Sequence, residues 1–135
     1  MGEPAAVGAE SVLLVEDDAA VAQMYRLRLE LAGYLVLTAT DGDTGLSMAE
    51  RFQPDLIIVD IGLPGMNGLD LLDVIRASDL VRDIPVLILT NFEDPESEKR
   101  SLELGARQFL RKSKTTPDAL TASVRRSISS GDAIA

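Results

Sequence analysis

Four short runs of aliphatic residues restrict the fold of this chain more than any other feature of its sequence. Each run is rich in Val, Ile and Leu and does not alternate with polar residues. The runs are Val12–Val15, Leu35–Leu37, Leu56–Val59 and Val86–Leu89, with Phe109–Leu110 as a shorter fifth candidate. Such runs are typical of strands that are buried on both faces, as in parallel sheets.

Helical patterns fill the intervals between these runs. The apolar residues with helical spacing are Ala20, Met24, Leu27 and Leu31, then Leu71, Leu72 and Ile75, and finally Leu120, Val124 and Ile128. Boundary signals mark these helices. Gly33 follows the first helix, and Asp41-Gly42 precedes a second helix that ends near Phe52. Asp94-Pro95 and Thr116-Pro117 are each expected to supply the N-cap and the first residue of a further helix. Strand and helix therefore alternate five times, which predicts an α/β fold with one parallel sheet and helices on both faces.

The chain has the length of one domain. Its 135 residues show no linker or internal repeat, and we place the domain at residues 11–129, with residues 1–10 and 130–135 as flexible tails. The helix expected near residues 95–104 has only Leu102 and Leu104 as apolar residues. We expect that helix to be weakly held and therefore able to move.

Composition excludes several kinds of function. The chain has no cysteine and no histidine, which excludes disulfides, zinc sites built on these residues and nucleophilic pairs that need them. Its net charge of −9 argues against direct binding to nucleic acid. No apolar run is long enough to span a membrane, so we expect a cytoplasmic protein. Residues 1–98 sum to −14 and residues 99–135 to +5, which indicates either ordinary solvated charge or a basic patch that faces a partner.

Polar side chains follow the expected strands at the points where the strands end. They are Glu16, Asp17 and Asp18 after the first run, Asp60 after the third, Thr90 after the fourth and Lys112 after the fifth candidate. The carboxyl ends of parallel strands lie at one edge of a sheet, where ligands bind. Two carboxylates roughly 4 Å apart repel by about 4 kcal/mol at an effective dielectric constant of about 20, and a divalent cation relieves that repulsion. Mg²⁺ is the expected ion because it accepts a few carboxylates and keeps several waters.

Each of these residues also has a simpler interpretation. Asp18 is expected to cap the first helix rather than to bind a metal. Taken alone, Glu16 and Asp17 fit an exposed loop, and Asp60 fits a turn. Their common location at one edge is what favours a phosphoryl-transfer site in which a carboxylate is the nucleophile.

Four segments of the sequence also resemble a known family. In order and spacing, LLVEDD, PDLIIVDIGLPGMNG, IPVLILT and FLRKS resemble the receiver domain of bacterial response regulators. The resemblance covers residues 11–129, nearly the whole chain. It implies a five-stranded parallel sheet in the order 2-1-3-4-5 with helices on both faces, the flavodoxin-like doubly wound fold, which agrees with the pattern of runs.

The resemblance implies a phosphoacceptor and a metal site. Asp60 is the implied phosphoacceptor, which takes a phosphoryl group from a histidine kinase or a phosphotransfer protein. Asp17, Asp60 and the backbone carbonyl of Gly62 are the implied Mg²⁺ ligands, and Glu16 is implied to act on the metal through water.

The resemblance also implies switch residues, at positions that include departures from the family. Thr90 and Lys112 match residues that contact the phosphoryl oxygens, and Phe109 matches an aromatic residue that changes rotamer with Thr90 on activation, although it lacks the hydroxyl of the commoner Tyr. Asn91 stands where a small residue usually follows the Thr, so we expect it to modulate access of the phosphodonor or water. Ser113 replaces the Pro that usually follows the Lys in a cis bond, which removes the usual reason for a cis bond there.

These features predict a signalling phosphoacceptor and not an enzyme, with only Mg²⁺-dependent self-phosphorylation from a donor and slow self-dephosphorylation. Phosphorylation of Asp60 is expected to draw Thr90 toward it and to rearrange the fourth helix and Phe109. The surface of the fourth helix, fifth strand and fifth helix would then change for a downstream protein, a separate output domain or a second copy of the chain. We expect the chain either to act alone or to be a receiver from a longer protein.

Three other functions remain open. A flavin carrier shares the fold, but Glu16, Asp17 and Asp18 would repel the flavin phosphate. A Mg²⁺-dependent phosphatase with an Asp nucleophile usually has a second Asp two residues later, where Gly62 stands here. The main alternative is a receiver-like interaction module that is not phosphorylated, which Ser113 and Asn91 motivate.

Overall fold

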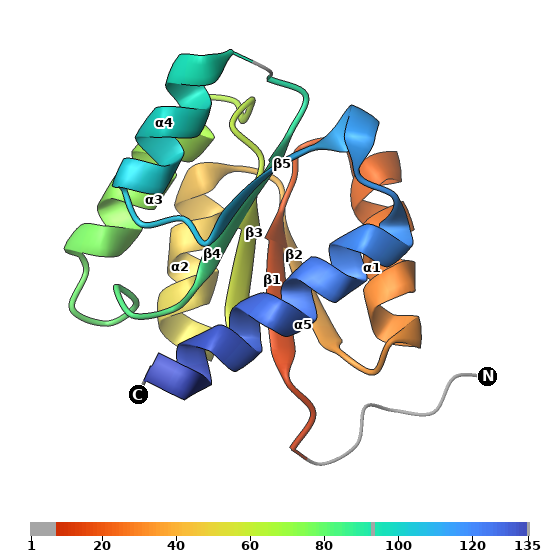
Figure 1. The fold of residues 1–135 in the computed structure, drawn as a ribbon. Coiled ribbons are helices and arrows are strands. Elements are labelled where there is room, and N and C mark those ends of the chain that lie inside the picture. Colours follow the sequence, from red (N-terminus) through yellow and green to blue (C-terminus); the bar gives the residue numbers. More distant parts are fainter. Residues whose placement is uncertain (1–7, 93, 135) are drawn as a thin grey trace.

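The computed structural model describes residues 8–92 and 94–134, with side chains described through Ser129. It contains one parallel sheet in the strand order β2-β1-β3-β4-β5 (Figure 1). The strands are β1 (Ser11–Val15), β2 (Leu35–Ala39), β3 (Leu56–Val59), β4 (Val86–Thr90) and β5 (Gln108–Arg111). The predicted fold class, the five strands and their order are confirmed.

Helices cover both faces of this sheet (Figure 1). They are α1 (Ala19–Leu31), α2 (Gly42–Phe52), α3 (Gly68–Ala77), α4 (Pro95–Glu103) and α5 (Pro117–Ile134), with a single 3₁₀ turn, η1 (Lys112–Lys114), between β5 and α5. Buried side chains of α1 and α5 share one apolar cluster, and those of α2 and α3 share the other. Every helix that the sequence predicted is present.

The continuous apolar runs follow from this two-sided burial. Successive side chains of a strand point to opposite faces, so each strand of the sheet interior supplies both clusters. The strand residues on the side of α2 and α3 include Leu13, Val15, Ile57, Val59, Val86 and Ile88. Those on the side of α1 and α5 include Val12, Leu14, Leu56, Ile58, Leu87 and Leu89. A polar residue at any of these positions would be buried, which explains the lack of alternation.

Short polar side chains begin the helices where the sequence predicted. The Asp18 carboxylate accepts hydrogen bonds from the backbone N–H groups of Ala20 and Val21 at 3.0 and 3.1 Å, so its predicted capping role is confirmed. The other N-caps whose side chains accept from the first turn are Asp41, Asn67, Asp94 and Thr116. These bonds satisfy N–H groups that have no partner within the helix.

The apolar face predicted for α1 is wrong. Ala20 is exposed, and Met24, Leu27 and Leu31 are 47%, 51% and 80% exposed. The residues that α1 buries are Ala22, Tyr25 and Leu29. Because α1 carries apolar residues on two stripes, helical spacing alone does not choose between them. Packing against the sheet and α5 makes the choice.

The structure describes only part of the two segments expected to be tails. The expected domain end at residue 129 falls within α5, which continues to Ile134. Residues 1–7 of the expected N-terminal tail lie outside the described residues. Within the described part of the chain, no helix combines the length and apolar character that crossing a membrane requires.

Gly68 at the start of α3 fixes the backbone that follows β3. A Cβ at this position would lie 2.2 Å from the carbonyl oxygen of Asp60 and 2.7 Å from the Cα of Ile61. The Gly68 N–H donates to the carbonyl of Ile61 at 2.9 Å. Because the neighbouring atoms are backbone, α3 can begin this close to the end of β3 only when residue 68 has no side chain.

We expect Gly68→Ala to lower the free energy of unfolding by about 2 kcal/mol or more, because backbone atoms cannot rotate away as a flexible side chain can. Urea denaturation measures the change. Asp73→Ala, at an exposed position of the same helix, is the matched control and should shift the free energy by no more than about 0.5 kcal/mol. Equal stability of the two variants would contradict the close approach.

Candidate functional site

The candidate site lies at the carboxyl ends of the strands, as predicted. It is a cavity of about 520 Å³, and the predicted site residues that line it are Glu16, Asp17, Asp60, Gly62, Thr90, Asn91 and Lys112. The chain turns one way from β1 to its neighbour β2 and the other way toward β3. Connections that leave in opposite directions open a crevice at this point of a parallel sheet, which is why the cavity forms here.

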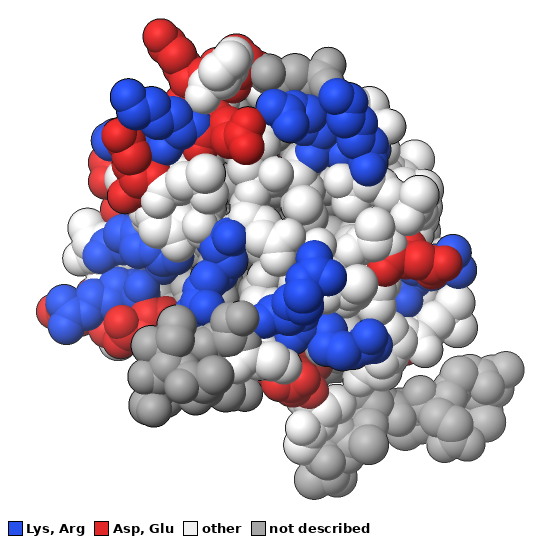
Figure 2. All heavy atoms as spheres, in the orientation of Figure 1, with Lys and Arg blue, Asp and Glu red and all other residues white. Residues whose placement is uncertain are grey.

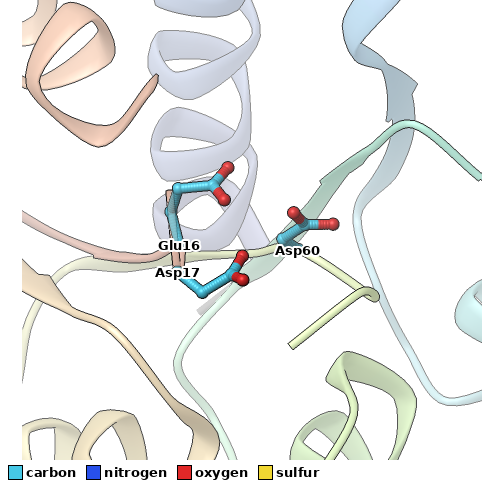
Figure 3. A group of neighbouring side chains, drawn as sticks. All are labelled: Glu16, Asp17 and Asp60. Atoms are coloured by element: carbon cyan, nitrogen blue, oxygen red, sulfur yellow. The ribbon is translucent and has the colours of Figure 1, made fainter. Parts of the chain in front are cut away.

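Three carboxylates meet beside this crevice. Glu16 and Asp17 project from the end of β1 and Asp60 from the end of β3 (Figure 3). Val15 and Val59 are partners in the register of these adjacent strands, so the residues that follow them lie side by side. One oxygen of each carboxylate lies within 4.8 Å of the others, with Glu16 and Asp60 buried and Asp17 exposed.

Both carboxylate oxygens of Asp60 accept hydrogen bonds. Oδ2 accepts from Lys112 Nζ at 2.9 Å, and Oδ1 accepts from the Thr90 hydroxyl at 2.8 Å and from the Gly62 N–H at 3.1 Å. Thr90 is therefore already in contact with Asp60, whereas the sequence interpretation had Thr90 approach only after phosphorylation. The Gly62 contact shown here is made by its N–H, and not by the carbonyl for which a metal role was expected.

Lys112 bridges two of the carboxylates. Its ammonium also donates to Glu16 Oε1, and the side chains of Lys112 and Glu16 are 12% and 3% exposed. Burial disfavours the charged ammonium, but hydrogen bonds to Asp60 and Glu16 outweigh burial and raise the pKa of Lys112. This lysine therefore carries its positive charge at neutral pH.

The two buried carboxylates respond differently to the same surroundings. Burial disfavours charge on Asp60, but the hydrogen bonds from Lys112, Thr90 and Gly62 together hold its pKa below the usual value. Burial raises the pKa of Glu16, against the opposing hydrogen bonds from Lys112 and from the Asp18 N–H. Asp60 is thus the carboxyl group of the pair that ionises more readily.

The donor set fits a hard divalent cation. Three carboxylates face one ammonium, so the group keeps excess negative charge in a crevice open to water. Oxygen ligands from a few carboxylates, completed by water, are what Mg²⁺ prefers. The acidic group therefore has the chemistry of a magnesium site.

The remaining predicted residues occupy different places. Asn91 is exposed at the cavity wall. Phe109 is buried beside Ile88 of β4, with the Arg111 guanidinium 5.7 Å from its ring centre, and it is not part of the wall. Every described peptide bond is trans, including that between Lys112 and Ser113.

The sequence prediction missed the apolar part of the cavity wall. Its members are Val21, Met24 and Tyr25 from α1 and Phe92 from the β4–α4 connection. The sequence did carry a signal for the three residues of α1. Val21, Met24 and Tyr25 follow Asp18 with helical spacing, which places them on one side of the helix, next to the acidic residues. Phe92 had no such signal because its position depends on the course of an irregular connection.

Comparison with known proteins gives one family. The family model for the response regulator receiver domain matches residues 12–125. The DNA-binding dual master transcriptional regulator RpaA of Synechocystis is 36% identical over 101 residues, and the alkaline phosphatase synthesis transcriptional regulatory protein PhoP of Bacillus subtilis is 34% identical over 103 residues. The matches cover 75% and 76% of this chain but only 42% of each relative.

Solved structures agree with that result over their whole length. A CheY-like response regulator receiver domain protein from Methanospirillum hungatei has a TM-score of 0.88 at 26% identity. The match covers 99% of that protein's chain and 94% of this one. Chemotaxis protein CheY4 of Vibrio cholerae has a TM-score of 0.82 at 32% identity. The match covers 98% of the CheY4 chain and 88% of this one. The chain therefore belongs to the response regulator receiver domain family, a family of signalling phosphoacceptors in two-component systems that are not classed as enzymes.

Proposed function

We propose that Asp60 accepts a phosphoryl group from a histidine kinase or a histidine phosphotransfer protein in a Mg²⁺-dependent reaction. The observation that carries the proposal is the position of Asp60, which accepts hydrogen bonds from Lys112 and Thr90 and lies in one acidic group with Glu16 and Asp17. An Asp60 oxygen forms a bond to phosphorus while the bond between phosphorus and the partner's histidine nitrogen breaks.

The donors around Asp60 suit the charge that this transfer brings. Asp60 is ionised at neutral pH and is available as the nucleophile. Lys112 and Thr90 already donate to its two oxygens, so after transfer they are placed to donate to the phosphoryl oxygens beside it. The same two groups that hold the free carboxylate would then hold its phosphorylated form.

The acidic group divides into direct and indirect metal contacts. We assign Asp17, Asp60 and the Gly62 carbonyl as Mg²⁺ ligands and Glu16 as a group that acts through water. Asp17 is exposed to the crevice, whereas Glu16 is buried and accepts hydrogen bonds from Lys112 and from the Asp18 N–H, which supports a direct role for Asp17 and an indirect one for Glu16. When bound, Mg²⁺ offsets negative charge on the transferred group.

The output surface consists of α4, β5 and α5. Lys and Arg side chains on this face lie among acidic ones (Figure 2): those on α4, β5 and α5 include Lys99, Arg100, Arg111, Arg125 and Arg126, and α4 also carries Glu96, Glu98 and Glu103. A face of mixed charge favours a partner whose own charges are complementary to both signs. The partner is a downstream protein, a separate output domain or a second copy of the chain; the relatives named as transcriptional regulators, which this chain spans only in part, support an output domain.

We expect one phosphoryl group to be added when the protein is incubated with Mg²⁺ and acetyl phosphate, because Asp60 is ionised and reachable from the cavity. Intact-protein mass spectrometry measures the addition. Asp60→Ala should abolish it, and Asp73→Ala, which removes an exposed carboxylate of α3, should leave it unchanged.

The outcome without addition separates two cases. Absence of both phosphorylation and Mg²⁺ binding would favour the interaction module that is not phosphorylated. Absence of phosphorylation with Mg²⁺ bound would indicate that Asn91 obstructs the small donor or that transfer requires the kinase.

Asp17→Asn should weaken Mg²⁺ binding by about tenfold or more, because it removes one ionised oxygen ligand. Isothermal titration calorimetry measures the affinity. Asp18→Asn is the matched control, since Asn caps a helix about as well as Asp and Asp18 is occupied with the N–H groups of α1. Equal affinities for the two variants would remove Asp17 from the ligand set.

Lys112→Met should lower the free energy of unfolding by about 2 to 4 kcal/mol without metal, because it leaves two buried carboxylates with no cation between them. Mg²⁺ should recover part of that loss by binding the native state. Urea denaturation with a chelator and with Mg²⁺ gives both values. The exposed Lys114→Met variant is the control, and a Lys112→Met protein as stable as that control would refute the bridging role.

A further inference from the structure

One guanidinium joins three segments at the edge of the sheet opposite the site. Arg76, in the last turn of α3, donates from Nε to the carbonyl of Leu104 at 3.1 Å and from Nη2 to that of Gly105 at 3.0 Å. Its Nη1 donates to the carbonyls of Arg82 at 2.9 Å and Ile84 at 3.0 Å. Two acceptors lie in the connection from α4 to β5 and two in the connection from α3 to β4.

The turn after α4 is shaped to receive this guanidinium. Gly105 has a φ of +86°, which side chains rarely allow. A Cβ there would also lie 3.0 Å from Arg76 Nε. Glycine at 105 therefore permits both the turn and the close approach of the charged group to the carbonyl oxygens.

The rest of α4 is held more weakly. Of its nine residues, all of which the structure describes, only Ser101 is buried. Glu98 pairs with Arg111 of β5 at 3.0 Å, but these side chains are 37% and 28% exposed, and pairs of this kind contribute little. Charge-assisted hydrogen bonds to carbonyls from a half-buried guanidinium are stronger, so the attachment of α4 is concentrated at its C-terminal end.

The other end of α4 leads directly to the phosphoacceptor. Thr90, which donates to Asp60, closes β4, and Asn91 and Phe92 at the cavity wall connect it toward the N-cap Asp94. Helix α4 thus runs from the site to the position of Arg76, beside α3 (Figure 1).

We propose that Arg76 is a positioning residue that acts as a fixed pivot for α4. The C-terminal end of α4 and its turn into β5 remain in place, while the N-terminal end moves when the group on Asp60 changes. The trigger of this motion rests on the proposed function, whereas the anchor is a property of the unmodified protein. Displacement of the output surface is then largest near the site and falls toward residue 105.

Hydrogen exchange of the full chain, resolved to single amides by mass spectrometry, tests the pivot. In the unmodified protein, we expect slower exchange at residues 101–106 than at residues 96–99. Mg²⁺ with beryllium fluoride, a mimic of the phosphoryl group, should change exchange at residues 96–98 and leave residues 101–106 unchanged. A change as large at 101–106 as at 96–98 would overturn the proposal.

Variants test whether Arg76 is the cause. Arg76→Met should raise exchange at residues 101–106 by about tenfold and extend the response to beryllium fluoride through residue 106. Arg76→Lys should not restore the native pattern, because one ammonium cannot address carbonyls in two connections as a planar guanidinium does. Arg51→Met, at an exposed position in the last turn of α2, is the matched control and should resemble the native protein.

The amides of β1 and β3, measured in the same experiment, separate a local anchor from general stability. They should exchange at native rates in Arg76→Met, and an equal rise there would overturn the pivot. If the native chain binds neither Mg²⁺ nor beryllium fluoride and takes no phosphoryl group from acetyl phosphate, the proposed function fails, while the exchange gradient along unmodified α4 still decides the anchor. A flat gradient would refute it.

Discussion

A single ammonium group, that of Lys112, stabilises the buried carboxylates at the carboxyl-terminal edge of this sheet. Lys112 contacts Glu16 and Asp60, which lie 96 and 52 residues away in the chain, and so it holds the ends of β5, β1 and β3 together. Without that cation, two buried carboxylates at neighbouring strand ends would repel each other across a medium less polar than water. The low pKa of Asp60 depends on this contact together with the hydrogen bonds from Thr90 and Gly62.

Most of the fold could be predicted because each strand carries its own signal. Strands buried on both faces need uninterrupted aliphatic residues, and Leu56–Val59 shows this in four letters. The N-caps at Asp18 and Asp94 were equally visible, since their hydrogen bonds are local. The buried face of α1 could not be predicted, because the helix has two apolar stripes and only the position of α5 decides which of them is buried. Local signals therefore predicted the elements, and contacts between distant segments decided how α1 is turned.

The site was predictable to the same extent. Strand ends brought Asp60, Thr90 and Lys112 to one edge, and the structure joins them by hydrogen bonds. The contact between the Thr90 hydroxyl and Asp60 in the unmodified protein was not predictable, because the rotamer of Thr90 depends on packing that no motif records. The role of Arg76 could not be predicted either, since its partners are backbone carbonyls that any residue could supply. In the sequence, the turn that Arg76 contacts is indicated by Gly105 alone.

The burial of Tyr25 gives the protein a built-in optical probe. The chain has two tyrosines, three phenylalanines and no tryptophan, so excitation at a wavelength that Phe does not absorb gives emission from the two phenol rings alone. Tyr25 is 3% exposed and lines the cavity, where burial raises its pKa and the charges of Lys112, Glu16 and Asp60 act on it. Tyr34 stands just before β2, at the opposite edge of the sheet. A change in the charge of the crevice therefore acts on the summed tyrosine emission through Tyr25, and Tyr34 adds the emission of a ring outside the cavity wall, without any label.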